Sequence, residues 1–269
     1  MSHISFSELK EWVNCPWKHK LMYLEKLKQF KGNEFTAFGT ALHTVCENLV
    51  TIDALGTQDT EKYNPNESFQ QEFLNNLSNL KKSSPDMIFN TDLVSSMRLQ
   101  ADYIIKHILP ELKTYFGKFE LFGVEEELYL PIEDQEQKFK GFIDLVIYTP
   151  QDKKYHIIDW KTCSWGWDSR RRTEKMVTYQ LTLYKHFWCK KHNKDYSEVL
   201  THFALLKRTA KKKNVEIFKV TNGAKKIGNA LKLLNKSLYN INKKNFIKNK
   251  LSCHGRYGTC EFYKSEHCK

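Results

Sequence analysis

Hydrophobic residues recur at helical spacing in the N-terminal part of the chain. A Ser-x-x-Glu capping-box pattern at 5–8 predicts the start of a helix. Residues 36–55 carry a hydrophobic stripe made of Phe38, Leu42, Val45 and Leu49. Two more helices are expected at 66–80 and 91–116, because the proline-containing sequence KKSSPD separates them and Gly117 ends the second.

From residue 121 the hydrophobic pattern becomes alternating or continuously apolar, and it is rich in β-branched and aromatic residues, which favours strands. Three consecutive antiparallel strands are expected at 121–132, 138–150 and 154–162. A helix at about 173–192 follows them. The remaining elements are two strands, a basic helix and an irregular tail with three cysteines, at 198–208, 214–221, 222–244 and 251–269. This order predicts an α/β fold.

Composition agrees with a folded, non-membrane protein. The 269 residues are 41% hydrophobic, enough for a substantial core, and no apolar run approaches the ~20 residues of a membrane-spanning helix. The start MSHISFSELKEW carries charge where a signal peptide would be apolar. We therefore expect a soluble, intracellular protein, cytoplasmic or of phage or organellar origin. Seven cysteines in such a chain suggest metal ligation, buried thiols or redox chemistry rather than disulfides.

The formal net charge of +12 is unevenly distributed along the sequence. Residues 201–250 hold 14 Lys+Arg and one acidic residue, whereas residues 120–136 hold seven acidic residues and no basic one. Such separation indicates a face that binds a polyanion, with nucleic acid the leading candidate. A lysine-rich, solvated surface remains the alternative at this point.

Two carboxylates and a lysine fall on adjacent predicted strands. Asp144 lies in GFIDLVI, and Asp159 and Lys161 lie in IIDWKT, where alternate positions share one face of a strand. Carboxylates on apolar strands cost desolvation free energy unless they are paired or bind a metal, and hard oxygen ligands suit Mg²⁺ or Mn²⁺. A metal there would activate water, and Lys161 would orient or stabilise the nucleophile. An Asp-Lys surface pair at a strand end is the alternative.

Further residues strengthen the active-site interpretation. Gln180 and Tyr184 stand four residues apart on the following helix, and His43 lies in GTALHTVCE. With D-x-K and G-x-x-D, these motifs resemble the PD-(D/E)XK nucleases over most of the chain. The nearest resemblance is to the RecB-like exonuclease branch, which includes AddB-type, CRISPR-adaptation and phage or mitochondrial single-strand nucleases.

The resemblance implies a role for each matching residue. His43, Asp144 and Asp159 match the metal ligands, and Lys161 matches the catalytic lysine. Gln180 and Tyr184 match a substrate-positioning motif. One of the three glutamates at 125–127 could add a carboxylate, and Glu126 is the residue we expect to face the site.

The implied fold is a restriction-endonuclease-like mixed β-sheet flanked by helices. Residues 1–118 would form a helical region that contributes His43 and one cysteine, and residues 119–221 the nuclease core. Residues 222–269 would form the basic helix and cysteine tail, and the three parts together one compact unit.

The cysteines fall into two groups. Cys46, Cys163 and Cys189 lie in or near regular elements, where buried thiols are expected. The other four resemble the split set with which many RecB-like nucleases hold an iron-sulfur cluster: Cys15, Cys253, Cys260 and Cys268. The tail spacing is C-x6-C-x7-C rather than the commoner C-x2-C-x5-C. A zinc site with His254 or His267 as a ligand therefore remains open, as does the absence of a metal.

A nucleic-acid path is suggested next to the predicted catalytic strand. Trp165, Trp167, Arg170, Arg171 and Arg172 follow it directly, and aromatic rings and guanidinium groups can stack on bases and bind phosphates. Basic residues also occupy the turn between the last two predicted strands, either as phosphate contacts or as a solvated hairpin tip: Lys207, Arg208 and Lys211 to Lys213.

The expected function is Mg²⁺- or Mn²⁺-dependent hydrolysis of DNA, as an exonuclease that prefers single-stranded ends, in DNA repair or recombination. The sequence has no G-x-x-x-x-G-K-[ST] motif, so unwinding would come from a helicase or recombination partner. Two alternatives stay open: an RNA-processing or site-specific endonuclease of the same fold, and a nucleic-acid-binding subunit without catalysis.

Overall fold

A computed structural model describes residues 3–27, 31–56, 63–255 and 258–269. The chain divides into two compact units, each assembled from segments that are separated in the sequence. Unit 1 comprises Met1–Lys31, Leu128–Gly141 and Gly223–Lys269. Unit 2 comprises Gly32–Glu127 and Phe142–Asn222.

The sheet of unit 2 mixes parallel and antiparallel pairs. Strand β3 (Lys138–Thr149), which begins in unit 1, pairs antiparallel with β4 (Lys154–Cys163), with Leu145 opposite Ile158. The next pair, β4 and β5 (Val199–Lys207), is parallel, and β5 pairs antiparallel with β6 (Val215–Val220). Strand β2 (Glu120–Pro131) also pairs with β3, and a sixth strand of the sheet, which lies in unit 1, pairs with the start of β3. The predicted restriction-endonuclease-like mixed sheet flanked by helices is confirmed.

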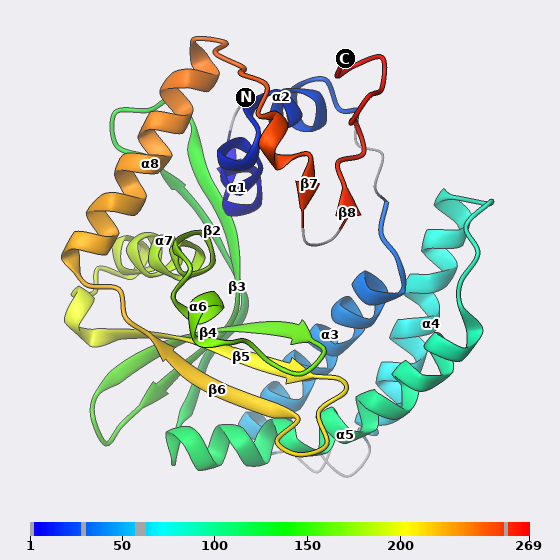
Figure 1. Ribbon diagram of the computed structural model, residues 1–269. Coiled ribbons are helices and arrows are strands. Elements are labelled where there is room, and N and C mark those ends of the chain that lie inside the picture. Colours follow the sequence, from blue (N-terminus) through cyan, green and yellow to red (C-terminus); the bar gives the residue numbers. More distant parts are fainter. Residues whose placement is uncertain (1–2, 28–30, 57–62, 256–257) are drawn as a thin grey trace. The chain divides into compact units, whose positions relative to one another are not determined.

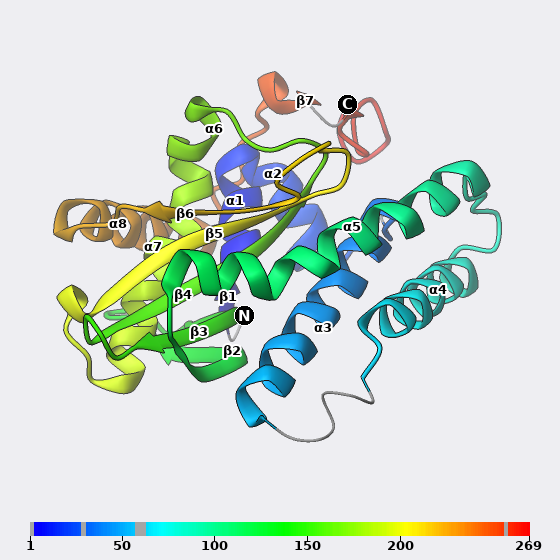
Figure 2. The same ribbon diagram turned by 90° about the horizontal axis from the view of Figure 1, so that it is seen from below.

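Three long helices and the sheet enclose the core of unit 2, and they lie side by side in Figure 2: α3 (Glu34–Leu55), α4 (Pro65–Ser83) and α5 (Thr91–Phe116). Fully buried Phe38 and Phe73 of these helices belong to the same apolar cluster as Ile158 and Trp160 of β4. Because side chains alternate along a strand, Asp159 and Lys161 point to the opposite face. Helix α7 (Lys175–His192) contacts β4 and β5.

Helix ends in unit 2 follow their capping residues. Asn33 caps α3 by accepting a hydrogen bond from the backbone N–H of Thr36, whose hydroxyl accepts one from the N–H of Asn33. Helix α5 ends at Gly117, where φ is +69°, as the sequence predicts. The helix expected at about 173–192 is confirmed as α7, and the short helix α6 (Ser169–Thr173), which was not predicted, precedes it, separated from it by the non-helical backbone of Glu174.

Unit 1 joins the two ends of the described chain. Strand β1 (His3–Ser5) pairs parallel with residues 138–140 of β3. Ser5 caps the next helix by accepting from the Glu8 N–H, but the Glu8 carboxylate binds His19 Nε2 at 2.9 Å, so only half of the predicted capping box forms. The helices and tail strands of this unit, labelled in Figure 1, are α1 (Phe6–Asn14), α2 (Pro16–His19), α8 (Ala224–Asn242), β7 (His254–Gly255) and β8 (Gly258–Thr259).

Short helical turns complete the two units. They are a π-helical turn at Lys20–Leu24 and 3₁₀ turns at Tyr196–Glu198 and Lys250–Ser252.

Over the part of the chain that the structure describes, none of the helices combines the length and the apolar character needed to cross a bilayer.

Candidate active site and metal centre

Three side chains from three different elements of unit 2 meet at one point. Each of His43 on α3, Glu125 on β2 and Asp144 on β3 offers a ligand atom, and these atoms all lie within 4.8 Å of one another. His43 Nδ1 is 3.7 Å from Asp144 Oδ2. Helix α3 passes close to β4 at Gly39, where an added Cβ would lie 3.3 Å from Thr162 Oγ1. The missing side chain of this glycine, one turn before His43, permits that approach.

The D-x-K residues of β4 lie among the side chains of α7. Asp159 Oδ2 is 2.5 Å from Lys161 Nζ, and Asp159 Oδ1 accepts a hydrogen bond of 2.8 Å from Gln180 Nε2. Gln180 Nε2 also lies 3.3 Å from the hydroxyl of Tyr184. The carboxylate of Asp144 is hydrogen-bonded to the same strand. Its Oδ2 accepts from the Trp160 backbone N–H at 2.7 Å.

Burial dominates the electrostatics of these groups. It raises the pKa of Asp144 to about 6 and that of Asp159 to about 6, while the Lys161 ammonium opposes both shifts. Burial, followed by the nearby Glu125 carboxylate, raises the pKa of Glu47 to about 8. Burial and then Lys161 lower the pKa of His43, which favours the neutral imidazole that ligates metals. The site therefore concentrates carboxylates at a free-energy cost that a cation would relieve.

The donor set fits a divalent cation. Carboxylate oxygens are the protein ligands that Mg²⁺ prefers. A set of carboxylates with one imidazole nitrogen also suits Mn²⁺. The predicted ligands His43 and Asp144 belong to the group of three, and Glu125 is its third member. Asp159 is bonded to Lys161 and Gln180 instead, so its role as a ligand stays a prediction.

The expected orientation of Glu126 is wrong. Its Oε1 lies 2.8 Å from Lys191 Nζ, and its Oε2 accepts from Trp188 Nε1 at 2.8 Å, so it links β2 to α7. Its neighbour Glu125 faces the candidate ligands His43 and Asp144 with φ at +46°, which is unusual for a residue other than glycine and interrupts the alternation of the strand. No sequence pattern among three consecutive glutamates indicates this interruption.

The four cysteines that sequence resemblance grouped together are close in unit 1. Cys15, Cys253, Cys260 and Cys268 all line one small pocket, and the Cys260 N–H donates to the Cys253 carbonyl at 2.7 Å. Burial and the three other thiols raise the pKa of Cys253.

The basic and aromatic residues after β4 differ in their surroundings. Trp165 and Arg170 are exposed. The guanidinium of Arg171 stands 4.8 Å from the centre of the Trp167 ring, and Arg172 Nη2 lies 2.6 Å from Glu216 Oε1. Arg172 is thus held in an ion pair.

The hairpin turn after β5 is partly structural. Lys207 is 7% exposed and its Nζ lies 3.0 Å from Glu216 Oε2. Arg208 is 9% exposed and donates to Gln100 Oε1 at 2.9 Å. These two residues support the sheet, which leaves Lys211 to Lys213, all exposed, as the basic tip of the hairpin.

Comparison with known proteins places this geometry in a family. The family model of the PD-(D/E)XK nuclease superfamily matches residues 3–264. A crystal structure of a "putative exonuclease" from Eubacterium rectale is similar in fold, with a TM-score of 0.55 and 14% sequence identity. The similarity covers 90% of this chain and 79% of that one. A search of curated proteins found no match.

Proposed function

Because the chain belongs to the PD-(D/E)XK nuclease superfamily, we propose that it hydrolyses phosphodiester bonds of DNA with Mg²⁺ or Mn²⁺. The observation that carries the proposal is the meeting of His43, Glu125 and Asp144 within 4.8 Å of one another. The neighbouring Asp159 and Lys161 complete the set of groups that such a reaction needs. Catalysis is favoured over binding alone, because every residue of the matched motifs is present.

The residues divide the work of an in-line displacement at phosphorus. His43, Glu125 and Asp144 would hold the metal, with Asp159 as the predicted further ligand. A bound divalent cation supplies Lewis-acid activation of water and neutralises charge on the phosphate. The Lys161 ammonium, oriented by Asp159, would stabilise the developing negative charge. Gln180 positions Asp159 through its hydrogen bond, and Tyr184 lies next to Gln180.

We further propose exonuclease activity on single-stranded ends, as in the RecB-like branch that the motifs resemble. The similarity to a protein described as a "putative exonuclease" agrees with exonuclease activity. The preference for single-stranded ends is favoured by exposed Trp165 and Arg170, four and nine residues after Lys161. Bases can stack on an aromatic ring only when they are unpaired or terminal.

We also propose that the four cysteines of unit 1 hold an iron-sulfur cluster rather than zinc. The support for a cluster is that all four cysteines line one pocket, together with their resemblance to the split ligand set of RecB-like nucleases.

Labelled single-stranded, duplex and circular DNA, together with RNA, test the activity directly. The wild type should degrade linear single strands with Mg²⁺ or Mn²⁺, and Asp144→Ala or Lys161→Ala should lower kcat by at least ~10²-fold, because each removes a ligand or a charge that stabilises the transition state. Asp53→Ala on the same helix as His43, a surface carboxylate paired with Lys113, is the matched control and should retain activity. Full hydrolysis by folded Asp144→Ala protein in EDTA would refute the proposal.

A further inference from the structure

Trp165 is the most exposed tryptophan of the described chain, with 72% of its surface accessible. Its Cα is four residues from that of Lys161, so the two lie at most ~14 Å apart. Successive phosphates of one strand are ~3.4 Å apart along a duplex axis and farther apart in an extended single strand, so this backbone separation spans at most about four nucleotides. A large, exposed ring therefore lies within a few nucleotides of the proposed reaction.

The backbone on both sides of Trp165 is anchored. On the N-terminal side, the Cys163 and Ser164 carbonyls accept hydrogen bonds from the backbone N–H groups of Arg208 and Thr209 at 2.9 and 2.8 Å. On the C-terminal side, the ring of Trp167 packs edge-on against Phe203, with ring centres 5.1 Å apart. The loop thus presents Trp165 from a fixed base.

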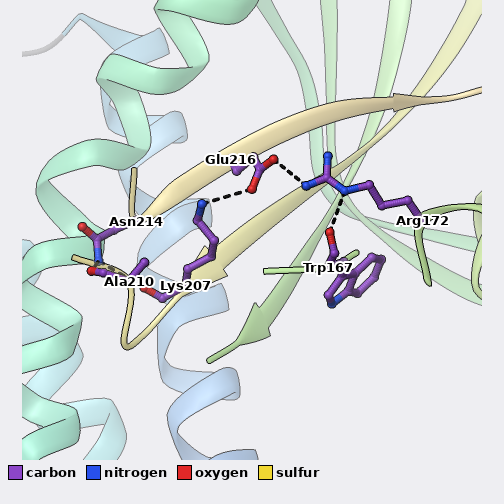
Figure 3. A network of polar contacts seen from close by, with 6 residues as sticks. All are labelled: Trp167, Arg172, Lys207, Ala210, Asn214 and Glu216. Atoms are coloured by element: carbon purple, nitrogen blue, oxygen red, sulfur yellow. Dashed lines mark hydrogen bonds and ion pairs between the residues drawn. The ribbon is translucent and has the colours of Figure 1, made fainter. Parts of the chain in front are cut away.

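A polar network that includes Glu216 of β6 holds the same loop, as Figure 3 shows. Glu216 bridges two cations, with Oε2 3.0 Å from Lys207 Nζ and Oε1 2.6 Å from Arg172 Nη2. Arg172 Nε in turn donates to the Trp167 carbonyl at 2.8 Å. Between the two tryptophans, Gly166 has φ at +126°, and an added Cβ would lie 3.3 Å from Lys207 Cδ. The glycine therefore allows the loop to lie against this network.

The surroundings of Trp165 suit an anionic, aromatic ligand. Glu216, the one acidic residue of the segment 201–250, forms ion pairs with both Lys207 and Arg172. The network of one negative and two positive groups therefore has a net positive charge. Arg170 is exposed at the start of the next helix. An unpaired nucleobase with its phosphate matches this combination, since the base stacks and the phosphate pairs with a cation.

We propose that Trp165 stacks on one unpaired nucleobase close to the scissile phosphate and thereby makes the site specific for single strands. This inference rests on the proposed nuclease function and deepens it. Trp165 is a specificity-determining residue, and the Glu216 network is the support that positions it. Stacking of one base predicts an effect at a single nucleotide position rather than along the whole strand.

An abasic scan tests this inference. Oligonucleotides that lack one base at successive positions from the end are bound in EDTA, so that affinity is measured without cleavage. For the wild type, affinity should fall by about 5- to 100-fold at one position, as expected for one stacked base. Trp165→Ala should show that loss with every oligonucleotide and no further loss at that position, and Trp165→Phe should recover most of the affinity.

Two controls keep the outcomes distinct. Tyr103→Ala removes another exposed aromatic side chain of unit 2, on α5, and should bind as the wild type does. Under turnover, Trp165→Ala should raise KM for single strands by a larger factor than it lowers kcat, and by a larger factor than it raises KM for blunt duplex. If Trp165→Ala shows the same position-specific loss as the wild type, the inference is wrong while the nuclease proposal stands. If the wild type cleaves no nucleic acid, the nuclease proposal itself fails.

Discussion

Neighbouring glutamates of β2 have different roles because of a single backbone angle. Glu125 reaches the candidate metal ligands from a positive φ, and the next residue, Glu126, reaches Lys191, His192 and Trp188. Positive φ at a residue other than glycine costs free energy and persists where the surrounding structure requires it. Burial raises the pKa of Glu126, but its three hydrogen-bond donors outweigh burial and lower it.

Paired substitutions in β2 separate the two roles. Glu125→Gln should lower kcat by at least ~10-fold and leave the free energy of unfolding nearly unchanged, because it weakens a metal ligand at the surface of the site. Glu126→Gln should have the opposite profile: near-normal kcat per folded molecule and about 1–3 kcal/mol less stability, because it removes the charge that three donors share. Urea titration and initial rates on the same preparations measure both. Equal losses of kcat in the two variants would contradict these assignments.

Strands β4 and β5 are linked at their buried face by two histidines. His156 Nδ1 lies 3.0 Å from His202 Nε2, and the Thr149 hydroxyl lies 2.8 Å from His156 Nε2. Burial is the main cause that lowers the pKa of His156 to about 4 and that of His202 to about 3, and the positive charge of Lys219 adds to both shifts. Both rings are therefore neutral in the folded protein at pH 7.

This histidine pair predicts a loss of stability in acid. In the unfolded chain each ring binds a proton below pH ~6.5, whereas the folded protein resists protonation until about pH 4 or lower, so stability falls as the pH drops from ~6.5. For His202 alone this amounts to ~2 kcal/mol at pH 5. Urea unfolding between pH 5 and 8 should show a shallower acid loss in His202→Leu than in the wild type. Parallel curves would show that His202 does not carry the dependence.

Most elements of unit 2 could be predicted because hydrophobic periodicity determines them locally. The helix expected at 91–116 and the strand expected at 154–162 are observed at Thr91–Phe116 and Lys154–Cys163. The three-residue strand β1 was not predicted, because so short a segment has no period and its partner lies over 130 residues away. The choice of Glu125 over Glu126 likewise depends on a backbone angle that tertiary contacts impose.

Across the whole molecule, the candidate metal ligands and the cysteines belong to different units. His43, Glu125 and Asp144 lie in unit 2, and the cysteine pocket lies in unit 1. Within unit 1 the two ends of the chain are joined, because Trp17 Nε1 donates to the His267 carbonyl at 2.9 Å and the Asn249 N–H lies 3.4 Å from Cys15 Sγ. A metal cluster in this pocket would stabilise the fold of unit 1 rather than take part in phosphodiester hydrolysis.

Anaerobic purification tests this role of the cysteines. The protein should be brown and contain iron, and Cys260→Ser should lose iron and unfold at lower urea concentration, since metal binding is coupled to folding of the joined ends. Cys163→Ser in unit 2 is the control and should keep the colour. Colourless protein that contains zinc would favour the alternative ligand set, and protein free of both metals would end the cluster proposal.

The discontinuous makeup of unit 1 has a consequence for the order in which the protein is made. A ribosome completes every segment of unit 2 before it begins Gly223–Lys269, and translating those last roughly 50 residues takes about 3–10 s at ~5–20 residues per second. During that interval Cys15 has emerged without its three partners from the tail. Stalled nascent chains ending near residue 222 should therefore expose Cys15 to alkylation, and released full-length chains should protect it.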